Sequence, residues 1–204
     1  MKESFIFFKE KIIRIFTEKK TIVDIGGGLR ISKTKGDSYS SSGSWILPYL
    51  NKVEYKILDP VSDYNPDIIG DIHNLPFDNN SQDAIICISV LEHVENPIKA
   101  SKELYRVLKV GGYCLVGVPF LYCYHAKKEY YKDYWRFTKD ILELLFNGFR
   151  VVEIQEISGA IATLLKMTPF YKFKVLRIIS DFIDRVFHKN KSRQTSGFFV
   201  FLVK

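Results

Sequence analysis

A glycine-rich turn directly after a short apolar run is the clearest chemical feature of this 204-residue sequence. The run at 21–25, Thr-Ile-Val-Asp-Ile, continues into Gly26, Gly27 and Gly28. Glycines that follow a buried strand let backbone N–H groups approach a ligand that a side chain would keep away. Gly26 and Gly28 form half of a dinucleotide-binding motif. Ile31 stands where the third glycine of that motif belongs, which disfavours an NAD site of the usual kind.

Two more apolar runs end in aspartate. Asp59 ends the second run, and Asp71 follows the third. An acid at the end of a second strand is well placed to accept hydrogen bonds from both hydroxyls of a ribose, although a turn acid before Pro60 is the structural alternative. Ile72 adds an apolar side chain and a backbone N–H that suit an adenine ring. The three run ends together predict the nucleoside-binding edge of a parallel sheet.

Strands alternate with helices along the chain. We expect strands at 21–26, 54–59, 67–70, 83–90, 113–118, 149–157 and 197–203. We expect helices at 5–16, around 45–50, from Pro97 to the Gly111-Gly112 pair, at 141–146 and within 160–190. Such alternation predicts an α/β protein with a doubly wound, mostly parallel sheet. The last two strands are expected to form an antiparallel edge, with a helical insertion before the last one.

The chain is expected to form a single domain. Its parts are an N-terminal helix at 1–20, a core at 21–159, a basic helical insertion at 160–193 and a last strand at 194–204, which together make up 1–204. The net charge is +7, and the insertion alone holds eight Lys and Arg against two Asp. Basic segments of this kind suit a phosphorylated substrate, an anionic membrane surface or nucleic acid.

The insertion carries an apolar stripe at helical spacing, opposite a face of Lys, Arg and Asp. The stripe consists of Val175, Ile178, Ile179, Phe182, Ile183 and Val186. We expect mainly a lid over the acceptor site, which buries Ile178, Phe182 and Val186 against the core. A peripheral helix on anionic lipid is the alternative, and it is compatible with a lid, because a basic face opposite Phe and Ile suits a membrane interface.

Other features favour a cytoplasmic protein. No apolar run approaches the roughly 18 residues of a membrane span, and the first residues do not have the pattern of a signal peptide. The three cysteines show no spacing typical of disulfides or zinc, so we expect reduced thiols and no metal site. The membrane alternative would place the insertion at the inner face of the membrane.

Longer motifs relate these strand ends to a family. Residues 83–94 read Asp-Ala-Ile-Ile-Cys-Ile-Ser-Val-Leu-Glu-His-Val, and residues 103–112 read Glu-Leu-Tyr-Arg-Val-Leu-Lys-Val-Gly-Gly. With the acids and glycines above, they resemble the small-molecule branch of the class I S-adenosylmethionine-dependent methyltransferases. The resemblance spans about half the chain and implies a Rossmann-like fold and S-adenosylmethionine as cofactor. One departure is the polar stretch between Gly28 and Trp45, where that family starts a helix almost at once.

The same resemblance implies which residues bind the cofactor. They are Asp24, Gly26, Gly27, Gly28, Asp59, Asp71, Ile72, Ser89 and Val90. The glycine loop would border the methionine moiety, and Asp59 would hold the ribose. Asp71 and Ile72 would contact the adenine, whereas Ser89 and Val90 would line the cofactor beneath its sulfonium.

A second resemblance covers His125 and the segment Asp-Tyr-Trp-Arg-Phe-Thr at 133–138. A histidine followed by such a segment is similar to methyltransferases that accompany glycosyltransferases in bacterial surface-polysaccharide pathways, except that Lys132 stands where those relatives usually carry proline. The resemblance implies an acceptor hydroxyl on a sugar or a lipid-linked glycan precursor. His125 and His93 are the candidates for the base that removes the hydroxyl proton.

The substrate-side candidates are Tyr131, Tyr134 and Arg136. Aromatic rings stack on a sugar or on the sulfonium cation, and a guanidinium holds phosphate or carboxylate. The structural alternatives are an ion pair of Arg136 with Asp133 or Asp140, core packing of Trp135 and Phe137, a capping role for His93 and an exposed loop position for His125.

Two rival functions stay open. One is a methyltransferase for a quinone-like or other small aromatic acceptor, and the other is a module that binds S-adenosylmethionine without catalysis. A nucleic-acid substrate is not expected, because 89–92 reads Ser-Val-Leu-Glu and lacks the Asn/Asp-Pro-Pro-Tyr type of motif that clamps the amine of a base. A small-molecule or glycan substrate is the expected partner.

Overall fold

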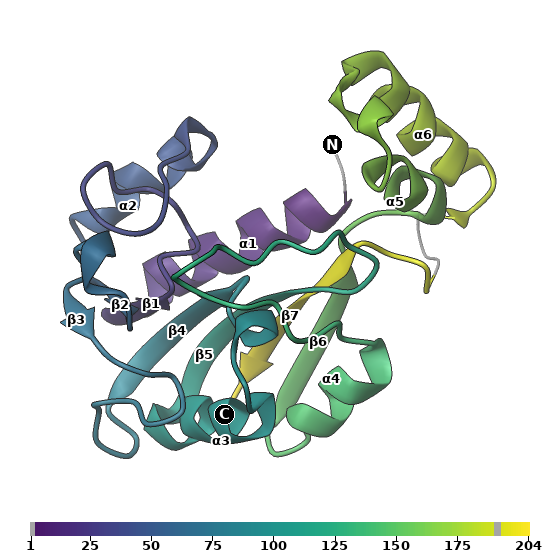
Figure 1. The fold of residues 1–204 in the computed structure, drawn as a ribbon. Helices are drawn as coiled ribbons and strands as arrows, with labels where there is room; N and C mark the ends of the chain where they lie inside the picture. The colour runs from purple at the N-terminus through teal and green to yellow at the C-terminus, as the bar shows by residue number, and fades with distance from the viewer. Residues whose placement is uncertain (1–2, 190–192) are drawn as a thin grey trace.

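Seven strands in the described part of the chain form one mostly parallel sheet (Figure 1). The structure is a computed structural model that describes residues 3–189 and 193–204. The strands are β1 (Thr21–Ile25), β2 (Glu54–Asp59), β3 (Ile68–Ile69), β4 (Gln82–Ile88), β5 (Leu108–Pro119), β6 (Val151–Glu156) and β7 (Gly197–Val203). The predicted segments 1–20 and 160–193 include residues 1–2 and 190–192, which lie outside the described residues.

The strand order explains where the strand ends meet. The spatial order is β3-β2-β1-β4-β5-β7-β6, and β1 runs parallel to β2 on one side and to β4 on the other. The order of the strands therefore reverses at β1 and β4, and open α/β sheets bind ligands at the carboxyl ends of such a point. β7 runs antiparallel to both β5 and β6. The predicted doubly wound, Rossmann-like fold with an antiparallel pair at its edge is confirmed.

Helices cover both faces of this sheet (Figure 1). They are α1 (Glu3–Glu18), α2 (Leu47–Leu50), α3 (Pro97–Val107), α4 (Lys139–Leu145), α5 (Ala160–Lys166) and α6 (Lys174–Val186), with short 3-10 turns η1 (Ser41–Ile46), η2 (Ser62–Tyr64), η3 (Leu91–His93) and η4 (Pro169–Lys172). α1 packs Ile12 and Phe16 on the face that holds Ile22. α3 and α4 pack Leu104 and Leu142 on the opposite face.

The Gly111-Gly112 pair does not end α3, as the sequence pattern predicted. The helix ends at Val107, and β5 begins at Leu108. Gly111 has φ +75°, and the pairing of β4 with β5 changes register between Gln82 and Ala84. The pair therefore lies in an irregular start of β5, where a residue without a side chain adopts the left-handed conformation at little cost.

The insertion folds as a helical hairpin whose apolar stripe faces outward. Asp184 on α6 is buried, and its carboxylate accepts hydrogen bonds from the backbone N–H groups of Ile161 and Ala162, both at 2.9 Å. This carboxylate caps the first turn of α5 and turns the polar edge of α6 inward. The exposed fractions of Ile178, Phe182 and Val186 are 60%, 65% and 52%. The predicted burial of these three residues against the core is wrong.

Asp24 connects β1 to the glycine loop. Its side chain is fully buried and accepts hydrogen bonds from the N–H groups of Gly28 (3.0 Å) and Leu29 (3.1 Å) and from the hydroxyl of Tyr55 (2.6 Å). Burial raises the pKa of Asp24 to about 6, although these three donors oppose the shift. The loop is therefore held from beneath by a carboxylate that water does not reach.

The raised pKa of Asp24 gives a testable dependence of stability on pH. Between pH 4 and pH 6 the folded state keeps the Asp24 proton that the unfolded chain has lost, so this group lowers the free energy of unfolding as pH rises. Replacing Asp24 by Asn removes this contribution to the pH dependence of the free energy of unfolding. In urea titrations, the stability of D24N minus that of the wild type should increase by about 2 kcal/mol from pH 4 to pH 6 and level off above about pH 7. A difference that stays flat over this range contradicts the assignment.

The cap on α5 is tested by replacing Asp184. Asp184→Ala removes the acceptor of two N–H groups and should cost about 1–2 kcal/mol, the usual range for a lost helix cap. Hydrogen exchange at the amides of Ile161 and Ala162 should become faster by the corresponding factor. Asp78→Ala, at an exposed turn, is the matched control and should change stability by less than about 0.5 kcal/mol. Unchanged exchange in Asp184→Ala would show that the cap contributes nothing.

Candidate functional site

A cavity of about 1430 Å³ lies over the carboxyl ends of the parallel strands. Its walls include most of the residues predicted to bind the cofactor or the acceptor: Gly26, Gly27, Gly28, Asp59, Asp71, Ile72, Ser89, Val90, His93, His125, Tyr131 and Tyr134. Asp24 and Arg136 are not among the wall residues. The topology thus brings together in space what the sequence spreads over more than a hundred positions, because every parallel strand ends at the same edge.

The glycine loop forms one wall by packing directly on the end of β4. Gly26 has φ +76°, and a Cβ there would lie 2.7 Å from Cγ2 of Val90. A Cβ on Gly28 would lie 2.7 Å from the carbonyl oxygen of Ile88. Neither position has room for a side chain, so the two loops approach each other only because glycine stands at both.

Acidic groups line the next wall. Asp59 is buried, and its Oδ1 accepts a hydrogen bond from the N–H of Val61 at 2.8 Å. Burial raises the pKa of Asp59, and the nearby charge of Asp37 adds to the effect. Asp71 is more exposed and accepts hydrogen bonds from the backbone N–H and from Nδ1 of His73, both at 2.8 Å. Asp59 therefore stabilises the turn, which was the structural alternative for it, and it also lines the cavity.

The polar stretch after the glycine loop closes over the cavity, a contact that the sequence did not reveal. Asp37 lies in this stretch, lines the cavity and forms an ion pair with Lys127. Tyr131 donates a hydrogen bond to Asp37 at 3.4 Å. The Lys127 ammonium also lies 4.7 Å from the ring centroid of Tyr64. These contacts join the polar stretch to the segment after β5, and no local spacing in either segment indicates the pair.

The segment after β5 is organised around a buried carboxylate. Asp133 accepts two hydrogen bonds from Arg136, at 2.6 and 2.8 Å, and one from the backbone N–H of His125 at 2.8 Å. Hydrogen bonding by Arg136 lowers the pKa of Asp133 to about 2. Arg136 also donates to the carbonyl of Cys123. The ion pair expected as the structural alternative for Arg136 is present, and this residue positions His125 from outside the cavity.

Aromatic residues of the same segment fasten it to η3. The indole N–H of Trp135 donates to the carbonyl of Val94 at 2.8 Å, and Phe137 is buried in the core. The Tyr134 hydroxyl donates to Glu95 at 3.1 Å, and the Tyr134 backbone N–H donates to the carbonyl of Glu92 at 2.7 Å. Core packing, the alternative weighed for Phe137, is confirmed, whereas 42% of Trp135 is exposed.

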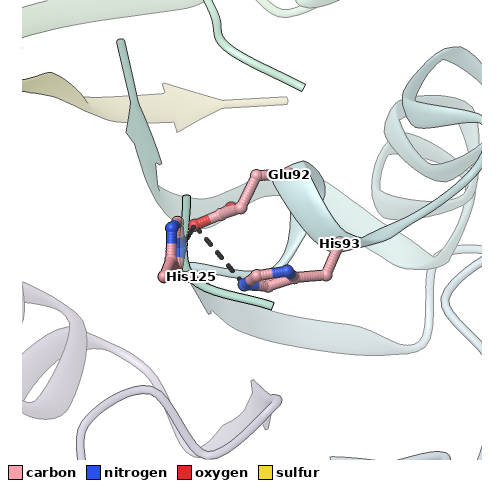
Figure 2. Close-up of side chains that lie close together, drawn as sticks. All are labelled: Glu92, His93 and His125. Carbon is pink, nitrogen blue, oxygen red and sulfur yellow. Dashed lines mark ion pairs between the residues drawn. The ribbon is translucent and has the colours of Figure 1, made fainter. Parts of the chain in front are cut away.

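Three ionisable side chains converge at the end of β4 (Figure 2). The carboxylate of Glu92 lies between His93, its neighbour on η3, and His125 from the loop after β5. Oε1 of Glu92 is 3.6 Å from Nε2 of His125 and 4.0 Å from Nε2 of His93. The Glu92 carboxylate is the main cause of a raised His125 pKa. The alternative for His125 was an exposed loop position, but only 30% of its side chain is exposed and it lines the cavity. The role of Glu92 was not predicted, because nothing near it in the sequence indicates that His125 approaches it.

A family profile described as a methyltransferase domain matches residues 55–116. An uncharacterized protein of Methanocaldococcus jannaschii is 30% identical over 145 residues, which cover 69% of this chain and 60% of that protein. The chloroplastic 2-methyl-6-phytyl-1,4-hydroquinone methyltransferase of Arabidopsis thaliana is 28% identical over 146 residues, which cover 67% of this chain and 42% of that enzyme. The chain thus spans less than two thirds of the length of either relative.

Solved structures share the fold over nearly the whole chain. The structure of a SAM-dependent methyltransferase from Archaeoglobus fulgidus has a TM-score of 0.59 at 13% identity and covers 99% of this chain and 100% of that one. The matched profile, 55–116, runs from β2 into β5 and contains the segment that carries Asp59, Asp71, Ser89 and Glu92. The chain therefore has the fold of an S-adenosylmethionine-dependent methyltransferase, and its central segment is similar to a methyltransferase domain.

Proposed function

We propose that this protein is a class I methyltransferase that transfers the methyl group of S-adenosylmethionine to a hydroxyl of a small molecule or glycan precursor. The observation that carries the proposal is one cavity whose walls combine the glycine loop, Asp59 and Asp71 with His93 and His125. The methyltransferase-domain match and the SAM-dependent structural neighbours support S-adenosylmethionine as the cofactor.

The cofactor half of the cavity suits each part of the molecule. Asp59 has one oxygen on the Val61 N–H, and its carboxylate accepts the ribose hydroxyls. Ile72 packs on the adenine, with Asp71 beside it. The glycine loop borders the methionine moiety, and Ser89 and Val90 lie beneath the sulfonium. Asp24 acts indirectly, since its carboxylate is occupied by the loop that it supports.

The acceptor half begins at the histidines. Methyl transfer from sulfonium to oxygen is an in-line displacement, so holding the acceptor oxygen in line with the methyl group supplies much of the rate. His125 and His93 line the cavity and face the same carboxylate, and they act on the acceptor hydroxyl. Tyr131 and Tyr134 contribute aromatic surface against a sugar ring. Arg136 supports this half through Asp133.

The acceptor is a sugar or a lipid-linked glycan precursor, in line with the motif at 133–138. A quinone-like acceptor is the second candidate, and the similarity to the Arabidopsis hydroquinone methyltransferase favours it. A domain that binds the cofactor without catalysis is the third. Consumption of S-adenosylmethionine with sugar nucleotides would support the glycan acceptor, and consumption with hydroquinones would support the quinone-like acceptor. Cofactor binding without consumption in either assay would support the non-catalytic domain.

The exposed stripe on α6 supports a membrane-bound form of this enzyme. No helix in the described residues is long and apolar enough to cross a bilayer. Ile178, Phe182 and Val186 nevertheless face solvent from one side of α6, with Phe187 next to them. Basic residues of the same hairpin include Lys172, Lys174 and Arg177. We infer that this hairpin binds the anionic inner face of a membrane, where a lipid-linked acceptor would be found.

Asp59→Ala tests the cofactor assignment. Loss of the carboxylate removes two charge-assisted hydrogen bonds to the ribose, each worth about 1.5–3 kcal/mol. Calorimetric titration with S-adenosylhomocysteine should show at least a hundredfold weaker binding. Asp63→Ala, an exposed acid in the next turn, is the matched control and should bind as the wild type does. An unchanged affinity in folded Asp59→Ala would overturn the ribose assignment.

Phe182→Asp tests the membrane surface. Because 65% of Phe182 is exposed, the substitution should leave the melting temperature nearly unchanged and remove binding to vesicles that contain phosphatidylglycerol. The wild type should bind these vesicles, release them at high salt and ignore pure phosphatidylcholine, because each basic residue near the surface contributes about 1 kcal/mol. Leu144→Asp, an equally exposed leucine on α4, is the control. A large fall in melting temperature, or vesicle binding that survives in Phe182→Asp, contradicts the proposal.

A further inference from the structure

We propose that Glu92, His93 and His125 form a binding site for a divalent first-row transition-metal ion at the edge of the cavity. One ligand atom from each residue lies within 4.8 Å of the other two. The site was not expected from the sequence, because its ligands come from a 3-10 turn and a distant loop and no short Cys/His spacing marks it. Its place in catalysis rests on the proposed methyl transfer, but the binding of the ion does not.

The buried carboxylate is the first observation behind this proposal. Glu92 is 1% exposed, and neither of its side-chain oxygens has a hydrogen-bond partner. Buried carboxylates are normally paired, hydrogen-bonded or bound to a metal, because leaving one unsatisfied costs several kcal/mol. The nearest polar atoms of the cluster are the two histidine nitrogens at 3.6 and 4.0 Å, beyond hydrogen-bond length. A positive charge between these three side chains would balance the buried Glu92 carboxylate.

The orientation of the two imidazoles is the second observation. Nδ1 of His93 lies 2.6 Å from the carbonyl oxygen of Lys132, and Nδ1 of His125 lies 3.0 Å from that of Cys123. A carbonyl only accepts, so each Nδ1 carries the hydrogen and donates it. In the neutral imidazole this leaves a lone pair on Nε2, and both Nε2 atoms face Glu92 (Figure 2).

Metal-bound histidines in proteins have hydrogen bonds of the same kind at the ring nitrogen that does not bind the metal. A ligating histidine almost always donates its other ring N–H to a carbonyl or a carboxylate, which fixes the tautomer and the ring direction. His125 has a carboxylate in addition, because Oδ2 of Asp133 lies 3.2 Å from its Nδ1. Arg136 holds that carboxylate in place through two hydrogen bonds. The cluster thus has three side chains that can bind a metal ion, together with the carbonyls and the carboxylate that orient its two imidazoles.

The donor set indicates the kind of ion. Two imidazoles and one carboxylate suit zinc, iron or manganese better than calcium or magnesium, which prefer oxygen ligands. Bonds of about 2.0–2.2 Å require ligand atoms roughly 3.0–3.5 Å apart, so small side-chain rotations would close the cluster on an ion. All three residues line the cavity, so an ion bound by them would be accessible from the acceptor half. A bound ion would hold an acceptor oxygen there, and the histidines would serve as ligands.

Metal titration of protein without an affinity tag tests the proposal. After removal of metals with EDTA, the wild type should bind one Zn²⁺ or Mn²⁺ per chain in calorimetry. Glu92→Gln, His93→Gln and His125→Gln should each weaken binding at least tenfold. His188→Asn, which changes a histidine beyond α6, is the control and should bind like the wild type. Absence of binding by the wild type, or equal affinity in the three cluster variants, overturns the site.

Titration with S-adenosylhomocysteine on the same samples separates this site from the proposed function. Cofactor binding without metal binding leaves the methyltransferase proposal intact and rejects the metal site, with a proton on His125 then balancing Glu92. Metal binding without cofactor binding gives the opposite result. If Glu92→Gln does not fold, as judged by circular dichroism, His125→Gln decides the question, because its side chain lies on a loop and is 30% exposed.

Discussion

Close contact between the loop after β1 and the end of β4 is the constraint on which the cavity depends. Both strands end at the point where the strand order reverses, and Gly26 and Gly28 bring their loops within a distance that excludes any Cβ. Asp24 then holds the glycine loop from below through two backbone N–H groups. A buried carboxylate of raised pKa is a costly support, and it stabilises the loop only because three donors satisfy it. The nucleoside side of the cavity follows from this packing.

A second buried carboxylate organises the opposite side. Asp133 binds both Arg136 and the backbone N–H of His125, and Lys127 of the same segment forms an ion pair with Asp37 of the polar stretch. The loop after β5 is therefore held by ion pairs at two points, Lys127 and Asp133, although it contains little regular structure. This arrangement places His125 opposite Glu92, so the acceptor side is built from ionic contacts and the cofactor side from close backbone packing.

The sequence predicted the sheet and the cofactor side well, because both follow from local patterns. Apolar runs ending in glycine or aspartate mark parallel strands, and the carboxyl ends of such strands must meet. The approach of His125 to Glu92 depends instead on loop contacts 33 positions apart, which no periodicity encodes. The outward stripe of α6 was misjudged for a similar reason. The pattern gave the apolar face correctly, but the cap that Asp184 provides for α5 decided which face points inward.

The ionic partner of Arg136 also could not be predicted from the sequence alone. A guanidinium three residues from an aspartate suits either a substrate phosphate or that neighbour, and only the burial of Asp133 decides in favour of the neighbour. His125, Tyr131 and Tyr134 of the same loop line the cavity, as the residues at the strand ends do. Asp24 and Arg136 lie behind the wall, where Asp24 binds the glycine loop and Arg136 binds Asp133.

The central claim, that this cavity holds S-adenosylmethionine, is tested most directly by a crystal structure with S-adenosylhomocysteine. The account predicts both ribose hydroxyls within hydrogen-bond distance of Asp59, the adenine against Ile72 and the homocysteine along Gly26–Gly28, with the sulfur facing the His125 side. A nucleoside bound away from Asp59, or no binding in the cavity at saturating ligand, would contradict it.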